Sequence, residues 1–320
     1  MVKVAIAGPG HLAREIIDAL LATGKHEIIL LARKDATPDL IVPGTTWVKV
    51  DYQDRGALVR ALQGVHTVLS FIVVSHDTNN TSQKTLIDAA IEAGVKRIAP
   101  SEWALANQAH LETFYANKLE IRKYLEYKNQ DKQVIEYTLF QPGWFMNYLA
   151  GPRGSTKRTP TSEMTLVDHG RLRAHVVAGA GNLDKPVTYT ALHDIANIVA
   201  KAVEYEGAWP TNGGINGHTL SLGEEITIGE KIRGKPFQIE ALEAEDLTAG
   251  IVKASWLPPL GHQQHPGEPS NDEFAKAVLR AMLLNHAAGA AVVSDEWNRI
   301  FPDYKFTKVD EFLTGAFGDA

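Results

Sequence analysis

The sequence predicts an α/β fold, in which a doubly wound and mostly parallel sheet is followed by a smaller C-terminal part. Short apolar runs alternate with amphipathic helical segments through the first 140 residues, and this alternation is typical of βαβ units. A glycine-rich turn, Gly8-Pro9-Gly10, joins the first apolar run to the first helical segment. The alternation and the turn together indicate a parallel sheet with helices on both faces.

Each element of this first part has its own local signal. Strands appear as short apolar runs, helix starts as capping residues such as Asp54, and helix ends as Gly64 and Gly94. Two prolines and a glycine mark residues 34–46 as a loop. We expect strands at residues 2–6, 27–32, 47–50, 67–72, 96–100 and 134–140, and helices at 11–21, 54–62, 78–92 and 112–127.

The turn at Gly8 has the spacing of a dinucleotide-binding fingerprint. Read from Gly8, the sequence is G-x-G-x-x-A, with Ala13 in the third position. Small residues there let the main chain approach a pyrophosphate at a helix N-terminus, where backbone N–H groups favour negative charge. The turn therefore predicts a Rossmann-type fold. Its expected cofactor-binding residues are Gly8, Gly10, His11 and Leu12.

A basic pair, Arg33-Lys34, follows the second predicted strand, and Arg33 stands 25 residues after Gly8. Enzymes that use NAD carry an acidic residue at this place, which binds the ribose 2′-hydroxyl. A guanidinium pairs instead with a 2′-phosphate, so Arg33 and Lys34 favour NADPH or NADP⁺ as the cofactor. The alternative is a solvated arginine at the end of a strand.

The composition changes at Gly151, where a basic segment rich in Gly, Pro and Thr begins. We expect a flexible connection at 151–160, between an NADP-binding domain at 1–150 and a smaller substrate-binding domain at 151–320. The expected later elements are a helix at 195–204 capped by Asp194, a turn at Gly213-Gly214, a strand at 219–222, a loop at 255–272 and a helix at 274–285. Segments near 187–230 are expected to return to the first domain.

The composition argues against several classes of function. The chain has 320 residues, a net charge of −6 and a pI of about 6.1, and it contains no cysteine. Without a basic run we expect no nucleic-acid partner, and without cysteine no disulfide and no thiolate chemistry. The first strand begins at residue 2, which leaves no room for a signal peptide, and the longest apolar stretch, 67–75, is too short to cross a bilayer. We expect a cytoplasmic protein, monomeric or homodimeric, with no membrane partner.

Five segments carry a resemblance to a known family. They are Ala7-Gly8-Pro9-Gly10-His11-Leu12-Ala13, Arg33, Ile98-Ala99-Pro100-Ser101-Glu102-Trp103, Tyr115-Ala116-Asn117-Lys118 and Phe140-Gln141-Pro142-Gly143-Trp144-Phe145. Together they resemble the isoflavone reductase-like, NmrA-like group of atypical short-chain dehydrogenases/reductases, over most of the first 200 residues. The chain departs from the family's G-x-x-G-x-x-G turn, because Ala7 and Ala13 stand at the ends of that register.

The resemblance implies that Lys118, on the fourth predicted helix, is an active-site lysine beside the nicotinamide ribose. Ordinary short-chain dehydrogenases carry a tyrosine four residues earlier, where this chain has Phe114. Tyr115 lies on nearly the same helical face and is the second candidate for proton transfer. Burial would disfavour the charged form of Lys118 and move its pKa toward working pH, so Lys118 is the preferred acid or base. The alternatives are a lysine that only binds the cofactor ribose and a lysine on the surface.

The carboxyl ends of the predicted strands supply the other candidates, because ligands of open α/β sheets bind there. The expected cofactor contacts are Ser70, Phe71, Ser101, Pro142 and Phe145. Nearby aromatic residues indicate a flat hydrophobic substrate. Its expected contacts are Trp103, Phe145, Tyr148 and His193. The alternatives are loop capping for the serines, core packing for the aromatic residues and packing at a helix start for His193.

These residues predict an NADPH-dependent reductase that transfers hydride to a conjugated C=C, C=O or C=N bond of a hydrophobic aromatic small molecule, as in secondary metabolism. Two alternatives stay open. One is a non-catalytic, NAD(P)-sensing regulator of the NmrA-like kind, and the other is an enzyme of non-redox cyclisation that keeps the cofactor bound. No metal site is expected, because His262 and His265 stand in a proline-rich loop without clustered carboxylates.

Overall fold

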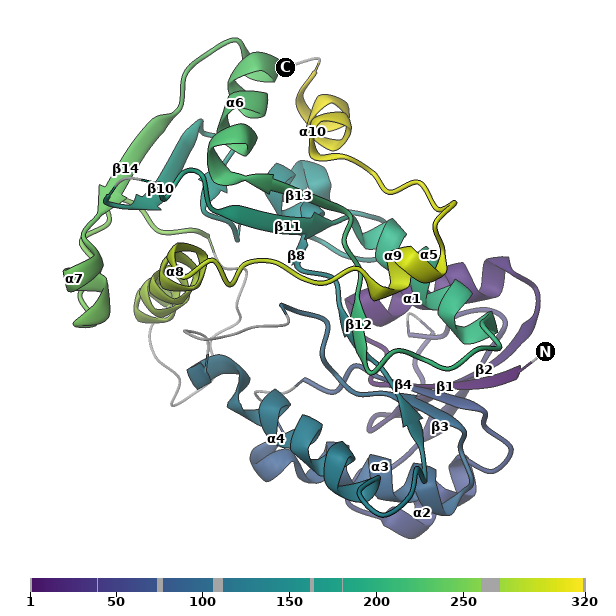
Figure 1. Ribbon diagram of the computed structural model, residues 1–320. Helices are drawn as coiled ribbons and strands as arrows, with labels where there is room; N and C mark the ends of the chain where they lie inside the picture. The colour runs from purple at the N-terminus through teal and green to yellow at the C-terminus, as the bar shows by residue number, and fades with distance from the viewer. Residues whose placement is uncertain are drawn as a thin grey trace.

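The computed structural model of the protein describes residues 2–38, 40–73, 77–105, 112–161, 164–179, 181–259 and 271–318 (Figure 1). At its centre is a six-stranded parallel sheet with the strand order β3-β2-β1-β4-β5-β6. The strands are β1 (Val2–Ala7), β2 (His26–Ala32), β3 (Thr45–Lys49), β4 (Thr67–Ser70), β5 (Arg97–Ala99) and β6 (Glu136–Tyr137). This is the strand order of a Rossmann fold, which confirms the predicted fold class and places a crevice where the order reverses, between β1 and β4.

Helices cover both faces of the central sheet. They are α1 (His11–Ala22), α2 (Arg55–Ala61), α3 (Thr81–Glu92), α4 (Glu112–Lys128) and α5 (Leu192–Glu204). Val4 and Ile6 belong to the core that α1 and α5 close, whereas Ala5 and Ala7 belong to the core under α2, α3 and α4. Because side chains alternate along a strand, the continuous apolar run of β1 serves both cores.

The other strands form three small sheets. β7 (Leu139–Gln141) pairs with β12 (Asn212–Gly214), β8 (Trp144–Phe145) and β13 (His218–Ser221) flank β11 (Pro186–Thr190), and β9 (Val167–Asp168) and β14 (Gln238–Leu242) flank β10 (Arg173–Val177). The remaining helices are α6 (Leu222–Arg233), α7 (Ala244–Thr248), α8 (Asn271–Ala287), α9 (Glu296–Ile300), α10 (Val309–Phe317) and the 3₁₀ helices η2 (Thr78–Asn80) and η3 (Met146–Gly154). In Figure 1, β8, β10, β11, β13 and β14 lie above the central sheet with α6, α8 and α10, and α2, α3 and α4 lie below it. Within the described ranges, no helix has both the length and the apolar character needed to span a lipid bilayer.

Two expected elements are different in the structure. The predicted strand at 134–140 divides into β6 and β7, which belong to different sheets. Gly213-Gly214 forms strand β12 instead of a turn. A Cβ on Gly214 would lie 2.2 Å from the backbone oxygen of Ser294, so glycine is required there by the close approach of two chain segments.

Asp194 does not cap a helix at residue 195, because α5 already begins at Leu192. Its carboxylate is buried in the first turn and accepts hydrogen bonds from the Tyr304 hydroxyl at 2.7 Å and the Thr307 N–H at 3.0 Å. The capping prediction is wrong because tertiary partners from the C-terminal segment take this side chain.

The connection expected to be flexible, 151–160, is held against α1. The guanidinium of Arg158 forms two hydrogen bonds with the carboxylate of Asp18, at 2.6 and 2.8 Å. His11 Nδ1 lies 2.7 Å from the Arg158 carbonyl oxygen, which can only accept a hydrogen bond, so Nδ1 is the donor. The segment is therefore held along α1, at His11 and at Asp18.

Candidate functional site

The two glycines of the turn between β1 and α1 meet different requirements. Gly8 has φ of +86°, and a Cβ on it would lie 3.1 Å from the backbone oxygen of Phe71, so the fold itself requires glycine. Gly10 is the N-cap of α1 with an ordinary φ of −79°, and no atom lies within 4 Å of where its Cβ would be. The missing side chain of Gly10 therefore leaves open space at a helix N-terminus, where an anion is favoured.

A groove of about 370 Å³ runs past this turn at the carboxyl ends of β1 and β2. It brings together five of the residues predicted to bind the cofactor, namely Gly8, Gly10, Arg33, Lys34 and Phe71. The agreement follows from the parallel sheet, because the loops after β1, β2 and β4 all leave the same edge.

The cations of this groove are available to a ligand. Arg33 and Lys34 are exposed, and neither forms an ion pair with any residue that the structure describes, whereas nearby Lys49 pairs with Asp35 at 2.7 Å. Two such cations opposite the helix N-terminus at Gly10 suit a ligand that carries phosphate groups at two separate places. A phosphorylated dinucleotide has this arrangement of charge.

Two aromatic residues of the groove, Trp47 and Tyr52, were not predicted. Trp47 Nε1 donates to the Lys34 carbonyl oxygen at 3.0 Å, and the Tyr52 hydroxyl donates to the Leu31 carbonyl oxygen at 2.9 Å. Burial raises the pKa of Tyr52, so its hydroxyl keeps its proton. Both residues come from β3 and the segment after it, and no local sequence pattern marks them as ligand contacts.

The side chain of Trp103 packs between two aromatic rings of the protein, those of Phe71 and Phe140. Its φ of +44° is rare for a bulky residue. The indole stacks on Phe71, with centroids 4.5 Å apart, and on Phe140, at 5.3 Å, and its Nε1 donates to the Ser70 carbonyl oxygen at 2.8 Å. These contacts match the packing alternative for Trp103 and tie the loop after β5 to the end of β4.

Lys118 is buried on α4 beside the loop that follows β5. Its side chain belongs to a residue only 8% exposed, and Nζ donates to the backbone carbonyl of Glu102. The Glu102 carboxylate in turn holds the Arg122 guanidinium in two hydrogen bonds of 3.0 and 2.6 Å. Burial lowers the pKa of Lys118 to about 8, against the raising effect of the Glu102 charge. The alternative of a surface lysine is therefore wrong, and the group can exchange a proton near neutral pH.

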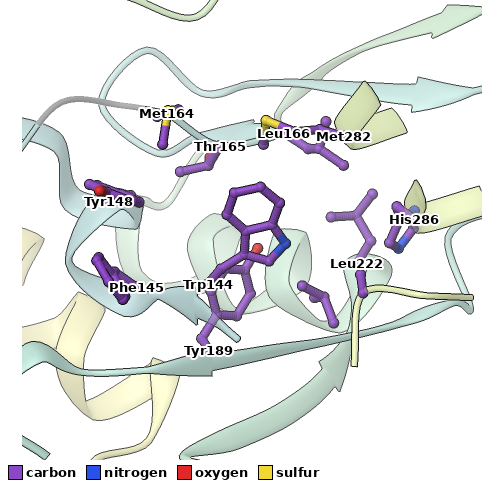
Figure 2. A pocket seen from close by; sticks show the side chains of 12 residues that line it. Trp144, Phe145, Tyr148, Met164, Thr165, Leu166, Tyr189, Leu222, Met282 and His286 are labelled. Carbon is purple, nitrogen blue, oxygen red and sulfur yellow. The ribbon is translucent and has the colours of Figure 1, made fainter. Parts of the chain in front are cut away.

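A second pocket lies in the C-terminal half, among β8, β11, α6 and α8 (Figure 2). Phe145 and Tyr148, two predicted substrate contacts, line it together with Trp144, and burial raises the pKa of Tyr148 to about 12. The free volume of the pocket is about 10 Å³, which has room for about one water molecule. Met164 and Met282 form part of the wall, and their unbranched side chains can move at low cost.

The sequence profile of the NmrA-like family matches residues 2–313. The chain belongs to the NmrA-like family. The resemblance inferred from the sequence is thereby confirmed, and it extends well beyond the first 200 residues.

Relatives of this NmrA-like protein include named reductases. Oxidoreductase swnR of Arthroderma benhamiae is 28% identical over 323 residues, 98% of this chain and 96% of that protein. The bifunctional pinoresinol-lariciresinol reductase of Forsythia intermedia is 25% identical over 329 residues, 96% of each chain. Among solved structures, the NADPH-dependent quinone oxidoreductase QOR2 of Escherichia coli, complexed with NADPH, aligns with a TM-score of 0.69 at 23% identity, over 98% of this chain and 99% of that one.

Several predicted site residues of the NmrA-like protein line neither the groove nor the pocket, and Lys118 and Trp103 are among them. His193 is exposed at the start of α5, where its Nε2 lies 2.9 Å from the Thr307 hydroxyl, so its position fits the packing alternative. The imidazole of His11 bonds to the Arg158 carbonyl, and the side chain of Leu12 packs against the core. Only the backbone of these two residues therefore lies at the turn.

Ser70, Ser101 and Pro142 are buried at the carboxyl edge and bonded to the protein. The Ser101 N–H donates to Gln83 Oε1 at 3.0 Å, and the Pro142 carbonyl accepts from the Thr190 hydroxyl at 2.7 Å. Their cofactor contacts stay predictions.

Other predictions fall on parts of the chain that the structure does not describe. The side chains of Phe114 and Tyr115 lie outside the described residues, although their backbone belongs to α4. His262 and His265 also lie outside them. Among the residues that are described, no group of three or more His, Asp or Glu is placed to hold a metal ion.

Proposed function

We propose that the protein is an NADPH-dependent reductase that delivers hydride to a conjugated C=C, C=O or C=N bond of a hydrophobic small molecule. The observation that carries the proposal is the groove at β1 and β2, where open space at Gly10 faces Arg33 and Lys34. The names of relatives support it, because they include a quinone oxidoreductase solved with NADPH and a pinoresinol-lariciresinol reductase.

The protein would bind the cofactor through the negative charges of its phosphate groups. Backbone N–H groups of the first turn of α1, after Gly10, would bind the diphosphate, and Arg33 with Lys34 would bind the 2′-phosphate. Phe71 places the cofactor along the end of β4, toward the loop that carries Trp103. NADPH supplies the hydride, and the protein supplies binding, orientation and charge.

Lys118 is the group that we assign to orient the cofactor ribose and to hold the proton that the reduced substrate takes up. Its environment disfavours the ammonium form, so it releases a proton more readily than an exposed lysine does. The carbonyl of Glu102 fixes the position of the amine, and the ion pair of Glu102 with Arg122 holds that loop in place.

The pocket behind Phe145 is the proposed substrate site. Its wall of Trp144, Phe145, Met164 and Met282 suits a flat, hydrophobic molecule better than a sugar phosphate. The two methionines would move aside as a ligand enters.

The proposal is tested by following nicotinamide absorbance in purified protein with NADPH and a panel of quinones, aromatic enones, aldehydes and imines. We expect loss of NADPH with at least one class, and a loss of turnover of about 100-fold or more in Lys118→Met. Binding of NADPH without oxidation by any member of the panel would favour the non-catalytic sensor, and full turnover in Lys118→Met would overturn the role of the lysine.

A further inference from the structure

The polar groups of the C-terminal pocket are few and unevenly placed. In Figure 2, Tyr148 lies with Phe145 on one side, His286 lies with Leu222 on the other, and Tyr189 rises between them. Most of the wall between these groups is apolar. The hydrogen-bonding capacity of these few atoms therefore decides which substituents a substrate can carry there.

Tyr189 offers the pocket an acceptor only. Its hydroxyl donates to Glu225 Oε2 at 2.8 Å, and Glu225 is fully buried with its other carboxylate oxygen 3.1 Å from His169 Nε2. Burial raises the pKa of Tyr189 far above its ordinary value, and the charge of Glu225 adds to the rise. The phenol therefore keeps its proton for the carboxylate, and only the lone pairs of its oxygen are left for a ligand.

His286 offers a second acceptor. Its Nε2 lies 3.1 Å from the carbonyl oxygen of Lys185, and because a carbonyl cannot donate, Nε2 must carry the hydrogen. Burial lowers the pKa of His286, so the ring is neutral at pH 7 and Nδ1 carries a lone pair. That nitrogen has no hydrogen-bond partner in the part of the chain that the structure describes.

The donors of the pocket are the Tyr148 hydroxyl on the Phe145 side and the Trp144 indole Nε1–H, which Figure 2 shows between the two sides. Thr165 uses its hydroxyl within its own loop, donating to the Val167 carbonyl at 2.5 Å and accepting from the Val167 N–H at 2.9 Å. Tyr148 keeps its proton, because burial raises its pKa to about 12. The pocket thus has a donor at Tyr148 on the Phe145 side, the Tyr189 acceptor and the Trp144 donor between the two sides, and the His286 acceptor on the far side.

We propose that Tyr189 and His286 are specificity-determining residues, which select substrates with an O–H or N–H group at the end of the molecule remote from the reducible bond. The inference rests on the proposed function, because it takes this pocket as the substrate site. An acceptor-bearing group such as a carbonyl would lie beside Tyr148, and the donor group would reach past the centre of the pocket to Tyr189 and His286.

A matched pair of probes separates this reading from simple hydrophobic binding. 4-Hydroxybenzylideneacetone and 4-methylbenzylideneacetone carry groups of similar size, but only the first can donate a hydrogen bond. An apolar pocket prefers the methyl probe, because burying a hydroxyl without a partner is unfavourable. If the hydroxyl group donates to Tyr189 or His286, the hydroxyl probe binds more tightly than the methyl probe. The sign of the preference therefore decides the question.

The measurement is calorimetric titration of each probe into the full chain saturated with NADP⁺ at pH 7. We expect the hydroxyl probe to bind about 3- to 10-fold more tightly than the methyl probe. Equal binding, tighter binding of the methyl probe, or no binding of either would overturn the inference. Failure of NADP⁺ itself to bind would instead overturn the proposed function, so the two failures are distinguishable.

Two variants of α8 test whether His286 itself sets the preference. His286→Leu removes the acceptor at similar length, and we expect it to weaken the hydroxyl probe while leaving the methyl probe equal or tighter. Met282→Leu changes the same wall at nearly constant volume and should affect both probes alike. Equal weakening of both probes in His286→Leu would indicate a structural role only and would overturn the assignment.

Discussion

Lys118→Met should make the protein more stable at neutral pH. The pKa of Lys118 falls from 10.5 to about 8 on burial, and such a shift corresponds to about 3 kcal/mol of destabilisation while the amine is charged. Methionine has similar length and no charge, but it loses the hydrogen bond to the Glu102 carbonyl, which contributes about 1 kcal/mol. The expected gain in the free energy of unfolding at pH 7 is therefore about 2 kcal/mol.

The pH dependence gives this prediction its signature. The folded-state pKa lies below the unfolded-state value, so the unfolded chain binds more protons between pH 8 and 10.5. The native protein should therefore gain stability as pH rises through that window, and Lys118→Met should lack this gain. The advantage of the variant is largest below pH 8 and shrinks above it.

Urea unfolding followed by tryptophan fluorescence, at pH 7 and at about pH 10, measures both effects. Lys123→Met is the matched control, because Lys123 is exposed on the same helix and its replacement should change the free energy of unfolding by less than about 0.5 kcal/mol. A Lys118→Met variant that is less stable at pH 7, or that follows the pH dependence of the native protein, would refute the reasoning.

Further substitutions test the site at other points. Gly10→Ala should fold normally and bind NADPH at least about 10-fold more weakly, since its Cβ enters open space, whereas Gly8→Ala should fail to fold or melt much earlier; unchanged NADPH affinity in a titration of Gly10→Ala would contradict this. His193→Ala should leave KM and kcat within about 2-fold, because His193 lies outside both cavities; a clear rise in KM would restore its substrate role. Asp194→Ala should lower the free energy of unfolding by about 2 kcal/mol, because the Tyr304 hydroxyl and a backbone N–H lose their acceptor; equal urea midpoints would count against it.

The groove that we propose for the cofactor could be predicted from the sequence, because the signals of its residues are local. Gly8, Gly10 and Arg33 each stand directly after a strand, and a parallel sheet carries such residues to one edge. Lys118 was placed by resemblance to a family, and its burial then followed from the packing of α4 against the loop after β5.

The pocket that we propose for the substrate could not be predicted in the same way, because tertiary contacts alone bring its lining residues together. Tyr189, Glu225 and His286 come from β11, α6 and α8, and no spacing in the sequence joins them. The indole of Trp103 stacks on Phe71 and the imidazole of His193 lies beside the Thr307 hydroxyl, contacts that no local sequence pattern predicts, and their substrate contacts stay predictions.

The glycine pair at 213–214 also shows that a local sequence pattern does not reveal tertiary contacts. Gly213-Gly214 has the composition of a turn, yet it forms a strand because another segment passes too close for any side chain. A local pattern cannot distinguish a glycine that turns the chain from one that admits a neighbour.

Calorimetric titration of NADPH and NADH into the native protein and Arg33→Ala tests the central claim most directly. We expect the native protein to bind NADPH about 10-fold or more tightly than NADH, because the exposed Arg33 guanidinium pairs with the 2′-phosphate. Arg33→Ala should lose most of that preference while keeping its affinity for NADH. No heat with either dinucleotide, or an undiminished preference for NADPH in Arg33→Ala, would contradict the account.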